Sequence, residues 1–416
     1  MDKMADVLGR AGAWCGQNKY LSAIKNAFQN FMPLTIAGAI GVLWCNVLVN
    51  DQTGLGLFFK PIMALDFLNP AFQAVNFCTI SCITVGITLG IAQEIGVWNM
   101  GAEKAGYIPG LVGLAAWLSV TNTSHMVDGA KEAFTGVAGN ELGATGLFTG
   151  MIIGVLSVEL FCFFEKQDAL KIKMPEQVPP GVARAFEVLV PATITLIITA
   201  CIGSACYNLT GLYLNDVIKN GIQGPLGAVG ATIPGVMIIY LVIMLFWLVG
   251  IHGNNMLSAV KEALFTPLAL ENVEKFNKGE KPTNIINMYA LQMWGEFGGS
   301  GVTIGLVIAI MIFGKREDNK AIATLSLVPG LFNINETVTF GIPMVLNPIL
   351  GIPFVFACLV TILVGYVLTV IGFCPVACLT VPWTTPPIVF GFLACGANVM
   401  GAVTQAILIA ISVVIY

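Results

Sequence analysis

Apolar runs of membrane-spanning length alternate with short polar segments along most of the chain. A helix of about 20 apolar residues crosses a bilayer. The pattern predicts spanning segments near residues 31–49, 72–92, 108–121, 143–164, 188–210, 227–250, 299–313, 343–372 and 376–416. Because the last two runs are long enough for three crossings, we expect an all-α integral membrane protein with about ten transmembrane helices.

Several of these runs are short or are interrupted by glycine and proline. Broken helices are tolerated at membrane depth where they are buried in protein or line a cavity, and in transporters they often mark the substrate site. Ahead of the first run, residues 1–30 contain basic residues but no apolar core of a signal peptide. We expect this segment to be an amphipathic helix on the membrane surface.

Composition supports the membrane assignment. Of the 416 residues, 56% are hydrophobic and 10% are charged, whereas soluble domains have about 25% charged residues. The net charge is −4 and no basic stripe is present, so we expect no nucleic-acid partner. Eleven cysteines are scattered along the chain, and there are two histidines. We expect the cysteines to pack as small apolar residues, and we expect neither a metal site nor a cofactor.

The basic residues predict the orientation. They gather in the N-terminal segment and again in 165–187, and cytoplasmic loops are enriched in Lys and Arg, so we expect a cytoplasmic N-terminus. The proline-rich 166–187 segment is the best candidate for a cytoplasmic linker between 31–165 and 188–416. Two further basic clusters flank the apolar stretch 285–313, and a re-entrant hairpin within 252–300 would reconcile them with one side of the membrane. The sequence leaves the topology of 252–320 open.

One carboxylate stands out. From Ala321 to Tyr416 there are 96 residues, and Glu336 is the only Asp, Glu, Lys or Arg among them. An ionisable group inside a membrane costs roughly 2.5–3.5 kcal/mol on insertion scales and usually marks a substrate or ion pathway. Asn333 and Asn335 precede it and threonines follow, which gives a dense polar patch. The alternative is a helix N-cap near the membrane interface.

The second candidate is His252, in the stretch GIHGNN at 250–255. Flanking glycines allow close backbone approach, and the histidine with Asn254 and Asn255 offers donors and acceptors for a polar, uncharged ligand. The alternative is a satisfied histidine at a helix end.

Two further stretches carry tryptophan. In PWTTPP, Trp383 and Thr384 lie in a segment that cannot be a regular helix, where the indole can face a sugar ring and the threonine can bind a hydroxyl. Gln292 and Trp294 precede the GGSG turn at 298–301. An interfacial tryptophan belt and a tight packing turn are the respective alternatives.

Together these residues suit a neutral polyhydroxylated solute and phosphoryl transfer to a hydroxyl. A carboxylate can accept the hydroxyl proton, and a histidine can hydrogen-bond or balance developing charge. We expect Glu336 and His252 to be catalytic. We expect eight residues to bind the substrate: Asn254, Asn255, Gln292, Trp294, Asn333, Asn335, Trp383 and Thr384.

The chain resembles the membrane-embedded IIC component of bacterial phosphotransferase-system permeases, in the lactose, cellobiose and diacetylchitobiose branch. The matching motifs are AIKNAFQNFMPLTIAGAI at 23–40, GIHG at 250–253, FTPLALEN at 265–272, GGSGVTIGL at 298–306, NINE and FGIPMVLNP within 333–348, and PWT at 382–384. The resemblance implies about ten membrane helices with re-entrant hairpins, a homodimer in the bacterial cytoplasmic membrane, a scaffold and dimerisation half at 31–165 and a sugar-binding half at 188–416.

The same resemblance implies a mechanism. A β-linked disaccharide would be bound outside, exposed inside by an elevator-like motion, and phosphorylated from a phosphocysteine on a IIB protein supplied in turn by IIA and HPr. The family's active-site histidine falls on His252, and its glutamate, which accepts the proton of the sugar 6-hydroxyl, falls on Glu336. Asn333 and Trp383 fall in sugar-binding stretches, while Asn254, Asn255, Gln292 and Trp294 would tune the choice of disaccharide. No IIB domain is recognisable in the chain, so IIB is expected as a separate partner.

Two rival functions are an ion-coupled transporter that leaves its sugar unmodified and a sensor that binds without transport. The sequence leaves open which disaccharide is taken, the inward or outward state, the protonation state of Glu336 and the completeness of the C-terminus.

Overall fold

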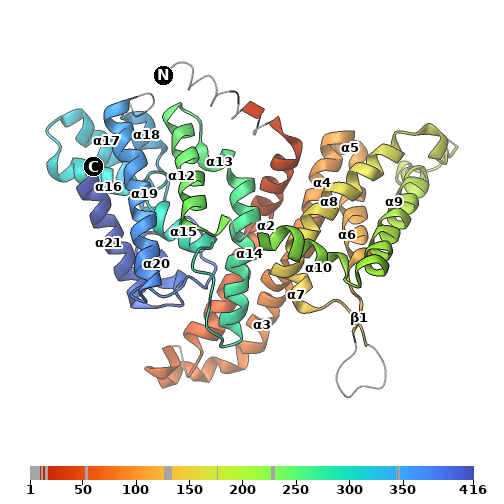
Figure 1. The fold of residues 1–416 in the computed structure, drawn as a ribbon, viewed down its shortest axis with the longest axis horizontal. Helices are drawn as coiled ribbons and strands as arrows, with labels where there is room; N and C mark the ends of the chain where they lie inside the picture. The colour runs from red at the N-terminus through yellow and green to blue at the C-terminus, as the bar shows by residue number, and fades with distance from the viewer. Residues whose placement is uncertain are drawn as a thin grey trace. The chain divides into compact units, whose positions relative to one another are not determined.

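The described part of the chain is 76% helical with almost no strand, which confirms the predicted all-α membrane fold (Figure 1). The computed structural model describes residues 10, 13, 14, 17–51, 55–125, 134–175, 177–225, 230–342, 344 and 347–416. Of the predicted surface segment 1–30, residues 1–9, 11, 12, 15 and 16 lie outside these residues, and helix α2 begins within it at Lys19.

Apolar helices lie in all the predicted runs. Among the described residues, five helical stretches are long and apolar enough to cross a membrane: Lys19–Leu48, Lys60–Met100, Ala144–Glu165, Pro180–Thr210 and Ile349–Val370. Shorter apolar helices occupy Ile108–Val120, Ile233–Leu248, Ile304–Phe313 and Val399–Ile415. The short ones fall where the sequence predicted broken segments, and most of them belong to the part of the chain that carries the candidate site.

The chain forms two compact units. The first comprises Met1–Gln17, Thr35–Phe77 and Gly227–Tyr416, and the second comprises Asn18–Leu34 and Cys78–Leu226. Helix α2 (Lys19–Leu43) contributes its start to the second unit and its end to the first. The predicted division into halves around 166–187 concerns function and stays a prediction.

The second unit is a bundle built on the helices α4, α6, α8 and α9. Its elements are α4 (Ile83–Met100), α5 (Ala102–Ala105), α6 (Ile108–Val120), α7 (Gly139–Leu142), α8 (Ala144–Glu165), α9 (Pro180–Thr210), α10 (Leu214–Ile218), the strands β1 (Ser124–His125) and β2 (Phe134–Thr135), and the short helices η4 (Ile80–Cys82), η5 (Asp168–Leu170) and η6 (Lys219–Gln223). Helices α4, α6 and α8 pack against one another and α9 covers α6 and α8 (Figure 1). Trp117 of α6 is fully buried against Val120 and Ile153 in this bundle.

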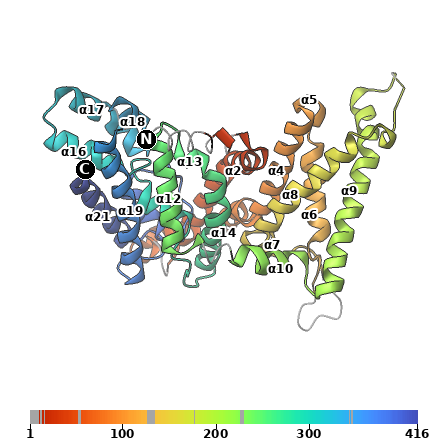
Figure 2. The same ribbon diagram turned by 45° about the horizontal axis from the view of Figure 1, so that its top comes forward.

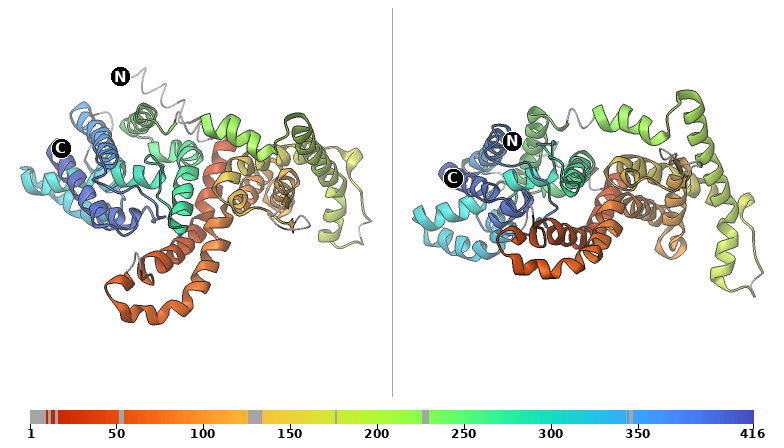
Figure 3. Two further views of the ribbon diagram at one scale, coloured as in Figure 1. Left: turned by 60° about the horizontal axis from the view of Figure 1, so that its bottom comes forward. Right: turned by 90° about the horizontal axis from the view of Figure 1, so that it is seen from below.

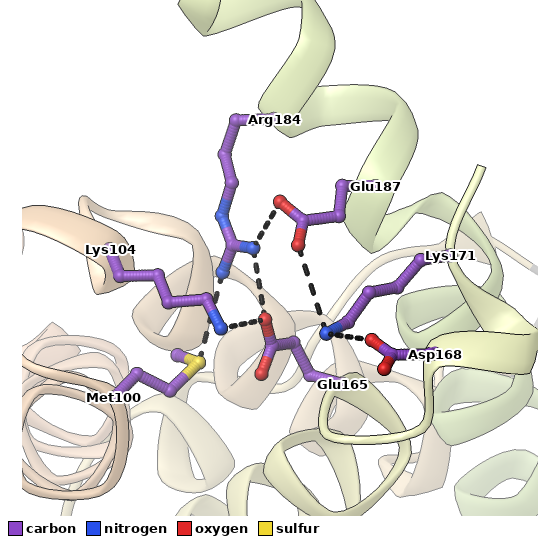
Figure 4. Close-up of polar contacts among 7 residues, drawn as sticks. All are labelled: Met100, Lys104, Glu165, Asp168, Lys171, Arg184 and Glu187. Carbon is purple, nitrogen blue, oxygen red and sulfur yellow. Dashed lines mark hydrogen bonds and ion pairs between the residues drawn. The ribbon is translucent and has the colours of Figure 1, made fainter. Parts of the chain in front are cut away.

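A charged cluster joins one end of this bundle (Figure 4). Glu165, the last residue of α8, has a side chain that is 1% exposed, and its Oε1 lies 2.8 Å from Lys104 Nζ and 3.0 Å from Arg184 Nη1. Arg184 on α9 also reaches Glu187 at 2.7 Å. A buried carboxylate is tolerated when it is paired and hydrogen-bonded, so this cluster ties α5, α8 and α9 together.

The first unit consists of helices that are separated by irregular segments. Its elements are η1 (Trp44–Leu48), η2 (Leu55–Leu57), η3 (Lys60–Leu68), α3 (Asn69–Cys78), α12 (Ile233–Leu248), α13 (Gly253–Met256), α14 (Ser258–Asn277), α15 (Met288–Gly295), α16 (Ile304–Phe313), α17 (Glu317–Leu331), α18 (Glu336–Gly341), α19 (Pro348–Val370), α20 (Val389–Ala394) and α21 (Val399–Ile415). Helices α12, α13 and α14 follow one another as a bent series (Figure 2), and α19 and α21, in blue, lie side by side (Figure 3).

Within the described part of this unit, the irregular segments between helices include 296–303, 332–335 and 371–388. They hold the GGSG turn, the asparagines before Glu336 and the Trp383 stretch. The predicted polar patches are therefore the places where the helices break, as expected for backbone that lines a site in a membrane protein.

Candidate active site

His252 is fixed at the turn between two helices. It is the N-cap residue of α13, and its Nδ1 accepts the backbone N–H of Asn255 at 3.3 Å. Its ring packs on Trp247, with centroids 4.4 Å apart. Because Nδ1 acts as an acceptor, a neutral His252 carries its proton on Nε2. The N-cap position fits the helix-end alternative, and the ligand-binding role of His252 stays a prediction.

The position after His252 has no room for a side chain, which explains the glycine there. A Cβ at this position would lie 2.0 Å from the carbonyl oxygen of Ile243. Any side chain would push α13 away from α12 and move His252 off Trp247.

Glu336 begins α18, directly after an irregular segment. Asn333 adopts φ of +63°, a left-handed conformation that asparagine tolerates better than most residues. Asn335 takes the N-cap position of α18, but its side chain makes no capping hydrogen bond. The helix-cap alternative therefore does not account for the asparagines, and the Glu336 side chain is left 47% exposed.

The two predicted catalytic residues face each other. His252 Nε2 lies 3.6 Å from Glu336 Oε1, and the side chains are 35% and 47% exposed. This separation is too long for a hydrogen bond, and because both side chains are partly exposed, solvent weakens the attraction between the carboxylate and the imidazole N–H. The arrangement offers a reachable carboxylate that faces a ring nitrogen, and this nitrogen is a donor in both the neutral and the protonated form.

Asn333 uses its amide on the backbone. Its Oδ1 accepts the Gly298 N–H at 2.7 Å, and its Nδ2 donates to the carbonyls of Trp383 at 2.5 Å and Thr385 at 3.0 Å. Both N–H donors are thereby engaged, so Asn333 joins the GGSG turn to the Trp383 stretch. Trp383 itself is 43% exposed.

Asn254 and Asn335 also turn toward the GGSG turn. Asn254 Nδ2 donates to Ser300 Oγ at 3.0 Å, and Asn335 Nδ2 donates to the Ser300 carbonyl at 2.8 Å. Asn335 is buried, whereas the Oδ1 of Asn254 is a buried acceptor without a hydrogen-bond partner among the described residues. Asn254 Oδ1 is therefore a buried acceptor that the described structure leaves unsatisfied.

The four remaining predicted residues differ in how deeply they are buried. Asn255 is exposed and contributes its backbone N–H to His252. Thr384 is half-buried beside Trp383. Trp294 on α15 is 1% exposed and packs on Gly365, where a Cβ would lie 2.4 Å from the indole. Within the described residues, no hydrogen bond or ion pair joins Trp294 or Gln292 to the His252–Glu336 pair, and Gln292 Oε1 is a buried acceptor without a partner.

Sequence reasoning missed a buried ion pair in the same unit. Lys261 on α14 pairs with Glu296, which also accepts the Tyr240 hydroxyl at 2.6 Å. Tyr240 and Trp247 are seven residues apart on α12 and so lie on one face of that helix, which places the ion pair along the face that supports His252. The available signal was the occurrence of both charges within largely apolar stretches.

The chain matches the family model described as "Phosphotransferase system, EIIC" over residues 25–358. It belongs to this EIIC family. The predicted resemblance is thereby confirmed, and the membership implies a role in sugar uptake and phosphorylation.

Three similar EIIC proteins cover nearly the whole chain. The oligo-beta-mannoside-specific EIIC component of Bacillus subtilis (strain 168) is 33% identical over 100% of this chain and 92% of its own length. The lichenan permease IIC component of the same organism is 32% identical over 99% of this chain and 90% of its own. The crystal structure of ChbC, the IIC component from the N,N'-diacetylchitobiose-specific phosphotransferase system, matches with a TM-score of 0.88 at 30% identity and covers 97% of this chain and 93% of that one.

Proposed function

We propose that this EIIC protein binds a β-linked disaccharide, moves it across the bacterial cytoplasmic membrane and presents its 6-hydroxyl to phosphorylated IIB. Similar proteins are named for oligo-β-mannosides, lichenan and N,N'-diacetylchitobiose, all of which are β-linked glycans. The substrates to compare are disaccharides of the cellobiose, diacetylchitobiose and lactose types.

The observation that carries the proposal is the pairing of His252 and Glu336. Glu336 accepts the proton of the 6-hydroxyl while the sugar oxygen forms a bond to phosphorus, and the phosphorus–sulfur bond to the IIB cysteine breaks, releasing a thiolate. The Nε2–H of His252 faces the Glu336 carboxylate and can turn to an oxygen that gains charge during transfer. Positioning and charge stabilisation are the main demands of phosphoryl transfer.

The half-exposed Trp383 supports the sugar assignment. Its indole offers a flat apolar face while its main chain is held by Asn333, and ligand sites typically combine apolar walls with a few placed polar groups. Asn254, half-buried and two residues after His252, is the candidate for such a polar group.

The proposal includes an elevator-like motion of the sugar-binding half, a cytoplasmic N-terminus and a homodimer. These follow from the family resemblance and from the distribution of Lys and Arg along the sequence.

Purified protein, phosphorylated IIB and a panel of radiolabelled disaccharides test the proposal. We expect a sugar 6-phosphate that forms with phosphorylated IIB, fails to form with unphosphorylated IIB, and does not depend on an ion gradient. Accumulation of unmodified sugar driven by an ion gradient would instead establish the ion-coupled transporter.

A further inference from the structure

The GGSG turn between α15 and α16 holds one serine in a tightly constrained position. Ser300 is 3% exposed and lies between Gly299 and Gly301, which adopt φ of +90° and +77°. A Cβ on Gly299 would lie 2.6 Å from the Asn335 side chain. The turn therefore needs glycine on both sides and packs directly on the segment that carries Glu336.

Ser300 bonds to both catalytic segments. Its Oγ accepts the Asn254 amide, two residues after His252, at 3.0 Å. Its carbonyl accepts the Asn335 amide, one residue before Glu336, at 2.8 Å. A single buried residue thus connects the histidine segment to the glutamate segment by one hydrogen bond on each side.

The turn that carries Ser300 is itself anchored. The Gly298 carbonyl accepts the Thr303 hydroxyl at 2.6 Å, and the Gly298 N–H donates to Asn333. The Gly301 carbonyl accepts the Tyr416 hydroxyl at 2.6 Å. Of these three bonds, the one from Tyr416 ties the turn to an element outside the two segments that it holds, so the turn can act as a reference for them.

We propose that Ser300 is a positioning residue that sets the separation of His252 and Glu336. It reaches neither side chain of the pair directly and acts through Asn254 and Asn335. The proposal rests on the proposed function, because it assigns Ser300 to the phosphoryl-transfer step of that same site.

Ser300→Ala tests the histidine side of this link. The change removes Oγ and its bond from Asn254, but keeps the carbonyl that holds Asn335. A displacement of about 1 Å can cost about 100-fold in rate, so we expect kcat for sugar phosphorylation to fall about 10- to 100-fold while KM changes less than about threefold. Ser300→Thr retains the hydroxyl and is expected to restore most of kcat.

Ser157→Ala is the matched control. Ser157 is also 3% exposed, and its Oγ donates to the Ile153 carbonyl at 2.6 Å in the second unit. The Ser157→Ala variant loses a buried serine hydroxyl, as Ser300→Ala does, but at a position far along the chain from His252 and Glu336. We therefore expect it to change the melting temperature about as much as Ser300→Ala does and to leave kcat unchanged.

A double-mutant cycle tests the route. If Ser300 acts through Asn254, then Ser300→Ala and Asn254→Ala delete the same hydrogen bond, and their effects on kcat are non-additive. Additive effects, an unchanged kcat in Ser300→Ala, or an effect confined to KM would overturn the proposal. Absence of sugar phosphate with the wild-type protein and phosphorylated IIB would instead overturn the proposed function, so the two failures are distinguishable.

Discussion

His252 points Nε2 at the Glu336 carboxylate from 3.6 Å, while its Nδ1 accepts a backbone N–H from Asn255. The two ring nitrogens therefore have separate tasks, one structural and one directed at the carboxylate. An N-cap hydrogen bond that the helix turn needs anyway fixes the tautomer that the pair requires.

This geometry predicts the histidine tautomer. With ¹⁵N-histidine labelling, we expect the neutral ring of His252 to show a protonated Nε2 and an unprotonated Nδ1. The chain has two histidines, so His125→Gln assigns the signals. A neutral ring protonated on Nδ1 would contradict the arrangement of the pair.

The Lys261–Glu296 pair predicts a large stability effect. The Lys261 side chain is 7% exposed and that of Glu296 is 15% exposed. Removing one partner of a buried ion pair leaves an uncompensated charge, so Glu296→Gln should lower the free energy of unfolding by about 3–5 kcal/mol. Thermal unfolding in detergent measures the change.

The control is Glu317→Gln, which removes an exposed partner of Lys320 and should cost less than about 1 kcal/mol. Equal effects of the two variants would show that the Lys261 pair is not a stabilising contact.

The charged cluster of the second unit makes a local prediction. Glu165 binds Lys104 and Arg184, so Glu165→Gln should loosen α5 and the start of α9. Hydrogen–deuterium exchange should rise in these two segments, whereas Asp168→Asn, at a side chain that is 81% exposed, should leave them unchanged. Unaltered exchange in the Glu165 variant would mean that the cluster does not hold the helices together.

The two tryptophans of the predicted site should behave oppositely. Trp383 is 43% exposed, so Trp383→Ala should weaken disaccharide binding about 10-fold with little effect on unfolding, in line with stacking losses of roughly 1–3 kcal/mol at aromatic platforms. Trp294 is buried, and Trp294→Ala should lower the free energy of unfolding by about 3–5 kcal/mol. Calorimetric sugar titration and thermal unfolding separate the two effects. Binding losses that fall on Trp294 rather than Trp383 would reverse the assignment.

The sequence predicted the membrane fold and the places where helices break, because apolar run length and Gly/Pro interruptions act locally. It also singled out Glu336, since an isolated carboxylate in a long apolar stretch is visible without any tertiary contact. Its pairing with His252 came from the family resemblance, because residues that distant along the chain meet only through packing that periodicity does not encode.

The amides were harder to predict. Asn254, Asn333 and Asn335 were expected to bind sugar, yet their Nδ2 groups donate to Ser300 or to backbone carbonyls of neighbouring segments. An asparagine carries the same donors and acceptors in either role, and its partner is decided by which backbone groups the fold leaves unpaired nearby. The Lys261–Glu296 pair was missed for a related reason, since neither charge reveals its partner along the sequence.

The central claim is that Glu336 is the general base for transfer from phosphorylated IIB to the sugar. Glu336→Gln keeps the shape and most polar contacts of the side chain but cannot accept a proton as a carboxylate does. The decisive measurement compares disaccharide affinity and sugar 6-phosphate formation in this variant and in the wild type. We expect an affinity within about threefold of wild type and a phosphorylation rate lower by at least about 100-fold, the lower end of the contribution of general base catalysis. Phosphorylation at the wild-type rate by the Glu336→Gln protein would contradict the claim.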